Sequence, residues 1–366
     1  NTAAAMCYTS GTTGDPKGVL YSHRSNVLHS MMANNGDALG ATSKDTMLPV
    51  VPLFHANSWG IAFSGPAMGT KLVMPGAKLD GASVYELLDT EKVTYTAGVP
   101  TVWLMLLQHM EKNKLSLPNL KVVICGGSAM PRSMIKAFDD MGIEVRHAWG
   151  MTEMSPLGTV GSLQAQFANL TGDAKLDVLQ MQGYAPFMVE MKITDDAGKE
   201  LPWDGKTFGR LKVRGPAIAG SYYRVDTKIL DENGYFDTGD VATIDKYGYM
   251  RITDRSKDVI KSGGEWISSI DLENLAVGHP KVAEAAVIGV HHPKWDERPL
   301  LIVQLKEGQT ATREEILQYM DGKIAKWWMP DDVAFVNAIP HTATGKILKT
   351  SLRDQFKDYS LPTAAA

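Results

Sequence analysis

The chain has 366 residues, of which 44% are hydrophobic and 21% are charged, which predicts a globular protein of about two or three domains. Its 37 Lys and Arg against 41 Asp and Glu leave a net charge of -4, so we expect no broad basic surface for nucleic acid. Its apolar runs are much shorter than the roughly 20 residues of a membrane span. Two separated cysteines, Cys7 and Cys125, form no disulfide or zinc pattern and favour a cytoplasmic protein.

The first half of the sequence alternates short strand patterns with longer helical patterns, as parallel α/β layers do. Residues 121–125 predict a buried strand that ends in two glycines, and residues 101–112 predict a helix. Pro131 suits the first turn of a further helix. The expected apolar faces of these two helices are Leu104, Leu107 and Met110 in one, and Met134, Ile135 and Phe138 in the other.

The second half changes to short alternating strands at 188–194, 210–214 and 247–253, separated by glycine turns. Beyond them we expect a helix over 271–277, strands over 283–290 and 300–305, and a helix opened by a capping box of Thr312 and Glu315. The predicted fold class is α/β. It has a large layered domain over 1–184, a β-rich subdomain over 185–254 and a small α+β domain over 255–366.

The decamer Thr9–Gly18 contains three glycines, four hydroxyl side chains and Lys17, after an apolar strand-like lead. Such a loop can surround a phosphate with backbone N–H groups and hydroxyls, while the lysine adds positive charge. The spacing of its glycines does not match the Walker pattern, which argues against that class of NTPase. A GxSxG motif is also missing from the sequence, which excludes a typical serine hydrolase.

This decamer resembles the phosphate loop of the adenylate-forming acyl-CoA synthetases, and later motifs resemble that family in the same order. The stretch 148–153 is similar to the family's Gly-Tyr-Gly-x-Thr-Glu motif, and 235–240 to the motif that ends in a ribose-binding Asp. Residues 254–268 resemble the family's hinge segment, and 340–346 its C-terminal lysine motif. The resemblance extends from Met6 to about Tyr359 and leaves out a family segment before the phosphate loop, which implies that the large domain is truncated at its N-terminus. The hinge segment implies that the small C-terminal domain is mobile.

The resemblance implies a role for each matching residue. The implied catalytic residues are Lys346, Thr152 and Glu153. The Mg²⁺ ion is implied to bind Thr9 and Glu153, and the implied hinge residue is Lys257. The residues implied to bind ATP or AMP are Thr9, Ser10, Gly11, Thr12, Thr13, Gly14, Lys17, Gly127, Ala148, Trp149, Thr152, Asp240, Arg255, Lys257, Lys261 and Trp266. Gly263 and Gly264 are implied to line the CoA site.

Acid specificity is expected at two stretches that resemble the fatty-acid branch of the family. The implied acyl-binding residues are His55, Trp59, Val99 and Gly127, with Trp59 as the gate of an acyl tunnel. The sequence thus predicts an ATP-dependent fatty acid–CoA ligase that uses ATP, Mg²⁺ and CoA and could form a homodimer at full length. Two alternatives stay open: adenylation of an aromatic or other carboxylic acid, and an inactive fragment that binds nucleotide or acyl groups.

Overall fold

A computed structural model describes residues 2–9, 15–263, 265–342 and 345–365. The chain folds into two compact units. Unit 1 comprises Asn1–Thr238 and Thr243–Arg251, and unit 2 comprises Gly239–Ala242 and Ile252–Ala366. The chain therefore passes between the units more than once.

Unit 1 is built on a six-stranded sheet in the order β4-β3-β5-β6-β7-β8. All neighbouring strands are parallel except β8, which runs antiparallel to β7. The strands are β3 (Thr46–Pro49), β4 (Lys71–Leu72), β5 (Tyr95–Gly98), β6 (Val122–Cys125), β7 (Glu144–Gly150) and β8 (Leu157–Val160). This arrangement confirms the predicted parallel α/β layer.

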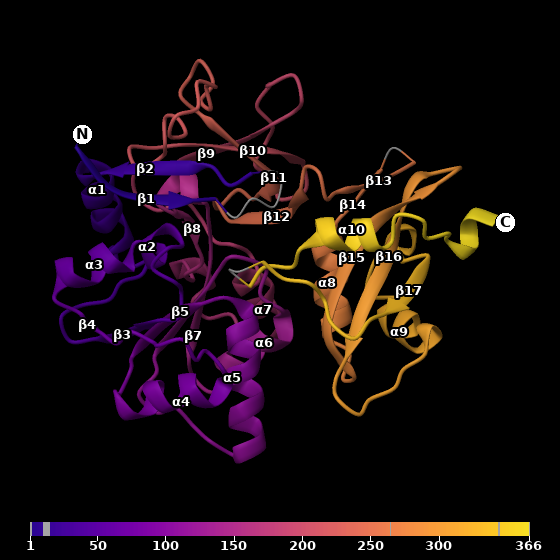
Figure 1. The fold of residues 1–366 in the computed structure, drawn as a ribbon, viewed down its shortest axis with the longest axis horizontal. Coiled ribbons are helices and arrows are strands. Elements are labelled where there is room, and N and C mark those ends of the chain that lie inside the picture. Colours follow the sequence, from indigo (N-terminus) through magenta and orange to yellow (C-terminus); the bar gives the residue numbers. More distant parts are fainter. Residues whose placement is uncertain (1, 10–14, 264, 343–344, 366) are drawn as a thin grey trace. The chain divides into compact units, whose positions relative to one another are not determined.

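Helices cover both faces of this sheet (Figure 1). They are α1 (His23–Ala33), α2 (Ala56–Trp59), α3 (Ile61–Met68), α4 (Gly81–Thr90), α5 (Pro100–Asn113), α6 (Arg132–Asp140) and α7 (Gly172–Leu179). Alternate residues of β6 point to opposite faces: Val123 and Cys125 pack against α4 to α7, whereas Val122 and Ile124 join the cluster with α1 and α3. Burial on both faces explains why β6 is apolar at every position.

Two details of the predicted helices are wrong. The buried face of α5 is formed by Val102, Trp103, Leu106 and Met110, while Leu104 and Leu107 are only partly buried. Pro131 precedes α6 as its N-cap, with ψ at 139°, and so stands outside the first turn. The predicted apolar face of α6, with Met134, Ile135 and Phe138, is buried and is confirmed.

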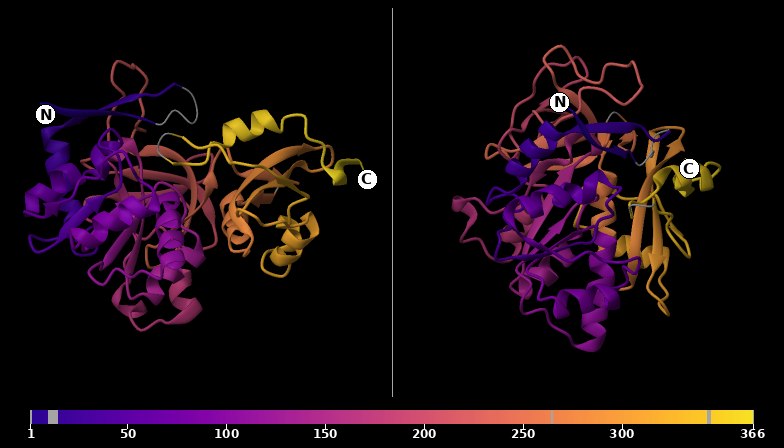
Figure 2. Two further views of the ribbon diagram at one scale, coloured as in Figure 1. Left: turned by 60° about the horizontal axis from the view of Figure 1, so that its bottom comes forward. Right: turned by 60° about the vertical axis from the view of Figure 1, so that its left-hand side comes forward.

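Two smaller sheets contain the remaining strands before residue 256, and β1 pairs antiparallel with β2 as β9 does with β10. The ribbon β1 (Ala3–Tyr8) and β2 (Gly18–Ser22) frames the predicted phosphate loop and can be followed in indigo from three sides (Figure 1, Figure 2). A four-stranded sheet has the order β12-β11-β10-β9. Its strands are β9 (Glu190–Thr194), β10 (Phe208–Arg214), β11 (Phe236–Ile244) and β12 (Met250–Arg255). Three of these four were expected from the sequence, and β11 was missed.

Unit 2 is centred on the long antiparallel pair β15 and β16. Its elements are β13 (Ile260–Ser262), β14 (Glu265–Ile267), α8 (Ser269–Val277), β15 (Val282–His292), β16 (Asp296–Leu305), α9 (Arg313–Met320), β17 (Asp332–Phe335) and α10 (Lys349–Gln355). Helices α8 and α9 pack on one face of the pair and α10 on the other. The Thr312 hydroxyl accepts the Glu315 N–H at 3.2 Å, which confirms the helix start, while the Glu315 carboxylate pairs with Lys281 at 2.8 Å.

A buried ion pair joins α10 to α8 inside unit 2. Lys349 Nζ lies 2.8 Å from Glu273 Oε1, and both side chains are largely shielded from water. Burial alone lowers the pKa of Lys349, but the nearby carboxylates of Glu273 and Asp254 outweigh it and raise that pKa. The lysine therefore stays charged, and the carboxylate beside it depends on that charge.

Lys349→Met should destabilise the chain by about 3 to 5 kcal/mol, because it leaves the Glu273 carboxylate buried beside an apolar side chain. Urea denaturation followed by circular dichroism measures the change. Lys357→Met, at an exposed position beyond the same helix, is the control and should shift the free energy of unfolding by less than about 0.5 kcal/mol. Equal shifts in the two variants would contradict the role assigned to the pair.

Candidate active site

The short 3₁₀ turn Thr152–Met154 follows β7 and buries a carboxylate. Glu153 is only 4% exposed, and its Oε1 accepts a hydrogen bond from the Tyr222 hydroxyl at 2.6 Å. The Tyr21 hydroxyl donates to the Thr152 carbonyl at 2.6 Å. Burial raises the pKa of Tyr21, and burial together with the hydrogen bond to Glu153 raises that of Tyr222, so both tyrosines remain hydroxyl donors.

The base of the predicted phosphate loop is closed by two hydrogen bonds between its ends. Thr9 N–H donates to the Lys17 carbonyl at 2.9 Å, and Lys17 N–H donates to the Thr9 hydroxyl at 2.9 Å. The Lys17 ammonium lies 4.8 Å from the centre of the Tyr222 ring. The structure thus brings Lys17 and Glu153 to the same tyrosine, whereas Ser10, Gly11, Thr12, Thr13 and Gly14 lie outside the described residues.

The predicted acyl-binding residues include an unusual backbone turn. Four successive non-glycine residues, Ala56 to Trp59, have φ between 45° and 56°, and Gly60 follows at 75°. This left-handed turn costs about 1 to 2 kcal/mol per residue. The Ser58 hydroxyl offsets part of that cost by donating to the Val51 carbonyl at 2.7 Å.

The left-handed turn places the Trp59 ring against the end of β6. A Cβ atom at Gly126 would clash with the Ala148 carbonyl at 2.9 Å and would press on that ring at 3.2 Å, so glycine suits both contacts. His55 precedes the turn, Val99 caps α5, and Gly127 has φ of 85°. Trp59 packs on the apolar cluster that includes Ala148.

Trp149, one of the residues expected to contact the adenine, is mostly covered by its own sheet. The side chain is 8% exposed, and a Cβ at Gly158 on β8 would lie 2.4 Å from its ring. Gly158 therefore permits β8 to lie flat against the indole. In this structure Trp149 is packed like a core side chain, and its role in binding a base remains a prediction.

Within unit 2, Asp240 and Arg255 form an ion pair at 2.8 Å, with Asp240 2% exposed. Trp266 lies in β14, and the Lys261 N–H donates to Glu297 Oε2 at 3.0 Å. Lys257 is exposed in the segment between β12 and β13.

Gly263 sits at φ 58° in a turn walled by two tryptophans. A Cβ there would lie 3.0 Å from the Trp295 ring and 3.3 Å from that of Trp327. A larger side chain would therefore press on both indoles, which would have to shift slightly, and it would also strain the backbone. Gly264, its partner in the predicted CoA site, lies outside the described residues.

Lys346 is carried by a turn that begins at His341. The Lys346 carbonyl accepts the Thr342 N–H at 2.8 Å, and His341 pairs with Ile347 through an isolated β-bridge. His341 Nε2 lies 2.8 Å from Glu284 Oε1, and this hydrogen bond raises the pKa of His341. Residues 343 and 344 lie outside the described part of the turn.

A magnesium ion fits the residues that are present at Glu153. Mg²⁺ is usually bound by one or two carboxylates together with substrate phosphates rather than by a cage of protein ligands. Among the described residues no group of three or more His, Cys, Asp or Glu side chains could hold a metal. A single buried carboxylate beside a predicted phosphate loop matches the first arrangement, with Thr9 as the further candidate.

Tyr222 and Tyr21 are the site residues that the sequence did not reveal. Tyr222 lies 69 positions from Glu153, and Tyr21 lies 131 positions from Thr152. Neither belongs to a motif with a recognisable spacing, so only the folded chain shows these contacts.

Two family patterns match the chain. The AMP-binding enzyme family matches residues 1–223, and the AMP-binding enzyme C-terminal domain matches residues 271–346. The chain is 53% identical over 359 residues to the 3-methylmercaptopropionyl-CoA ligase of Ruegeria lacuscaerulensis, covering 98% of this chain and 67% of that protein. It is 48% identical over 367 residues to the medium-chain-fatty-acid–CoA ligase of Ectopseudomonas oleovorans, covering 100% of this chain and 67% of that protein.

Solved structures of similar fold also exist. ATP-bound MatB from Rhodopseudomonas palustris has a TM-score of 0.84 and 29% identity, over 97% of this chain and 68% of that one. The O-succinylbenzoate coenzyme A synthetase of Bacillus subtilis, in complex with ATP and magnesium ion, has a TM-score of 0.81 and 27% identity, over 95% and 69%. The chain thus spans about two thirds of the proteins it resembles. None of the helices in its described part is long and apolar enough to cross a membrane.

The pair of His341 and Glu284 predicts a pH-dependent stability. Because the folded-state pKa of His341 is raised, the pair stabilises the fold fully below the unfolded value of about 6.5. That contribution is lost as the pH rises through the folded-state pKa. The free energy of unfolding lost in His341→Gln should therefore be larger at pH 5.5 than at pH 8.5. In a Glu284→Gln background the loss should be the same at both pH values, and a persisting pH dependence would refute the assignment.

Proposed function

We propose, from the premise that the chain belongs to the AMP-binding enzyme family, that it activates a fatty acid with ATP and transfers the acyl group to CoA. One observation carries this proposal: the Tyr222 side chain joins the buried Glu153 carboxylate to Lys17 of the predicted phosphate loop. A buried acid and a lysine beside a glycine-rich loop suit the binding of a nucleoside triphosphate with its metal ion.

Membership of the family confirms three of the sequence-based expectations. The resemblance to acyl-CoA synthetases holds, the fold is of the predicted α/β class, and the enzyme class is an AMP-forming acid–thiol ligase. ATP and CoA are the substrates of such a ligase, and Mg²⁺ is its metal ion. The residue roles, the acid and the division into domains remain proposals.

In the first half-reaction, an oxygen of the carboxylic acid attacks the α-phosphorus of ATP, and pyrophosphate leaves. Lys17 and the hydroxyls of the phosphate loop would bind the phosphates, with Thr152 beside them. Mg²⁺, when bound, supplies positive charge to the phosphate oxygens, and Glu153 and Thr9 would hold it. Lys346 would neutralise negative charge where the carboxylate meets the phosphate.

In the second half-reaction, the CoA thiolate attacks the acyl carbonyl carbon, and AMP leaves. We propose that unit 2 reorients about Lys257 between the half-reactions, which withdraws Lys346 and presents Gly263 and Gly264 to CoA. A turn without side chains lets a ligand approach the backbone closely.

The acid is proposed from the apolar surroundings of Trp59. The ring packs on a cluster of aliphatic side chains, which suits an alkyl chain better than a charged group. Two relatives described above are called 3-methylmercaptopropionyl-CoA ligase and medium-chain-fatty-acid–CoA ligase, so a short thioether acid is one alternative to be tested. The aromatic acid left open by the sequence is another. An inactive binding fragment is the remaining one, since the chain spans about two thirds of those proteins.

We further propose that the protein is cytoplasmic, that its full-length form is a homodimer, and that residues 1–184, 185–254 and 255–366 act as separate structural parts. ATP–pyrophosphate exchange across a ladder of fatty, thioether and aromatic acids tests the main proposal. Exchange that rises with alkyl chain length supports a fatty acid. The absence of exchange with every acid would favour an inactive fragment.

Trp59→Ala should change the ranking of acids by chain length, because it removes a large apolar ring from the predicted tunnel. The apparent affinity for ATP should stay near its starting value, since Trp59 packs on the apolar cluster. Initial rates of pyrophosphate exchange with acids of increasing length measure both quantities. Trp203→Ala, at an exposed indole in the same unit, is the control. An unchanged ranking accompanied by lower stability would make Trp59 a core residue only.

Lys346→Ala should slow acyl-adenylate formation by about 10² to 10³, the usual effect of losing one positioned charge or hydrogen-bond donor. Thioester formation from pre-made acyl-AMP should change by less than about tenfold, because the lysine is needed only before unit 2 reorients. Single-turnover assays separate the two steps. Lys306→Ala, at an exposed lysine of unit 2, should leave both unaffected. If Lys346→Ala slowed both steps equally, the proposed division of labour would be wrong.

A further inference from the structure

We infer that Tyr222 is a positioning residue that holds the metal-binding carboxylate and the phosphate-loop lysine in place for adenylation. The inference rests on the proposed function, because it assigns Glu153 to the metal ion and Lys17 to the phosphates. The residue belongs to the 215–223 segment, which follows β10 and has no regular secondary structure. Nothing in its sequence marks it as part of the site.

The 215–223 segment is bonded to two separate parts of the candidate site. Ala219 N–H donates to the Glu153 carbonyl at 2.7 Å, and the Ser155 hydroxyl donates to the Ala217 carbonyl at 2.7 Å. At its far end, Tyr223 N–H donates to the Gly18 carbonyl at 2.8 Å, where the phosphate loop enters β2. The segment therefore ties the turn that carries Glu153 to the base of the phosphate loop.

Tyr222 sits between these two anchors and uses both parts of its side chain. Its hydroxyl donates to Glu153 Oε1 at 2.6 Å, and its ring faces the Lys17 ammonium at 4.8 Å. A hydrogen bond to one carboxylate oxygen fixes the rotation of the group and directs the other oxygen. The ring attracts the exposed Lys17 ammonium and so favours its position beside the tyrosine.

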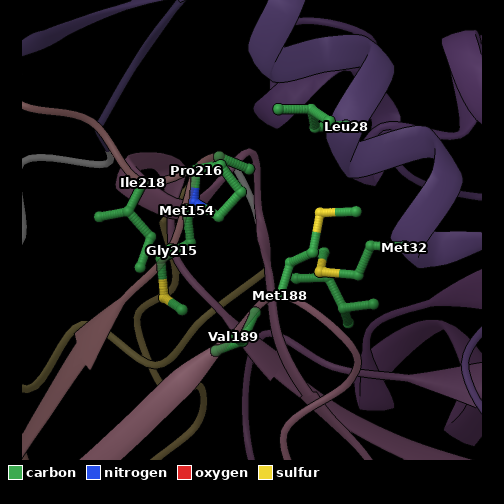
Figure 3. Close-up of a pocket in the computed structure, with 10 residues that line it drawn as sticks. Leu28, Met32, Met154, Met188, Val189, Gly215, Pro216 and Ile218 are labelled. Atoms are coloured by element: carbon green, nitrogen blue, oxygen red, sulfur yellow. The ribbon is translucent and has the colours of Figure 1, made fainter.

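The N-terminal end of the 215–223 segment makes apolar contacts. Residues 215–218 line a small apolar pocket together with Met154, Leu28 and Met32 (Figure 3). This pocket has room for about one water molecule and offers almost no polar surface. It is packing space rather than a ligand site. The hydrogen bonds from this segment to site residues come from residues 217–223. Among the described residues of the segment, Tyr222 is the only one that donates such a bond from its side chain.

The two roles of Tyr222 can be separated by substitution. Tyr222→Phe removes the hydroxyl and keeps the ring, whereas Tyr222→Leu removes both. Tyr223→Phe is the matched control, because the neighbouring Tyr223 is exposed and its hydrogen bond to the described site residues is made by its backbone N–H rather than its hydroxyl. Each variant is prepared in the full chain, and thermal unfolding without ligands shows how far it is folded.

Mn²⁺ replaces Mg²⁺ as a paramagnetic probe, and its affinity in the presence of ATP is measured by electron paramagnetic resonance. Tyr222→Phe should weaken Mn²⁺ binding by about 10- to 100-fold, as loss of a group that orients a metal ligand does. Affinity for metal-free ATP should be unchanged in Tyr222→Phe and about two- to fivefold weaker in Tyr222→Leu. Tyr223→Phe should match the unmodified chain in both measurements.

Unchanged Mn²⁺ affinity in Tyr222→Phe, or an equal loss in Tyr223→Phe, would overturn the inference. So would a failure of the unmodified chain to bind Mn²⁺ with ATP. Failure of the proposed function looks different: the unmodified chain would bind Mn²⁺ and ATP, Tyr222→Phe would bind Mn²⁺ weakly, and no acid would give pyrophosphate exchange. In that outcome the positioning role stands and the ligase reaction does not.

Discussion

A buried carboxylate must be compensated, and the arrangement of unit 1 around Glu153 follows from that requirement. Removing an ionised acid from water is costly unless hydrogen bonds or opposite charge replace the solvent. Glu153 is 4% exposed, and its contacts come from the 215–223 segment, far away in the sequence. That segment must be in place before the acid can be buried. The phosphate loop is bonded to the same segment through Gly18, so the two halves of the predicted nucleotide site are ordered together.

The left-handed turn at Ala56 to Trp59 also costs free energy, because its backbone conformation is unfavourable. Packing, rather than a polar partner from a distant segment, compensates that cost. Four residues at about 1 to 2 kcal/mol each would unwind in an isolated peptide. Packing holds them: Ser58 is fully buried and bonded to Val51, and the turn ends at Gly60, where a Cβ would collide with the buried His29 ring. Burial lowers the pKa of His29 to about 4, so this ring is a neutral partner. Strain of this kind is typical of functional sites, which agrees with the predicted acyl-binding role of Trp59.

The sequence predicts those features whose evidence lies within a short continuous stretch of the chain. Strand β6 was predictable because burial on both faces makes it continuously apolar. Strand β11 was missed because Asp237, Thr238 and Asp240 interrupt its apolar pattern, and yet Thr238 and Asp240 are buried, bonded to β10 and to Arg255. The motifs of the site were recognisable because each is continuous along the chain. Tyr222 was not, because its partners are joined to it only by the fold.

Hydrogen bonds on both sides of Lys257 bear on the proposed hinge. Lys257 was predicted as the pivot, but the residues on both sides of it are bonded within unit 2. The Thr253 carbonyl accepts the Ser268 hydroxyl at 2.6 Å, and Asp254 accepts the Ser269 N–H at 2.8 Å. Asp258 pairs with Arg353 at 2.6 Å on the other side. A reorientation about Lys257, as proposed, would have to release Thr253 and Asp254 from Ser268 and Ser269. The pair of Asp258 and Arg353 lies beyond Lys257 and would be kept. Because Asp254 is buried, its bond to Ser269 is the contact expected to oppose the rotation most.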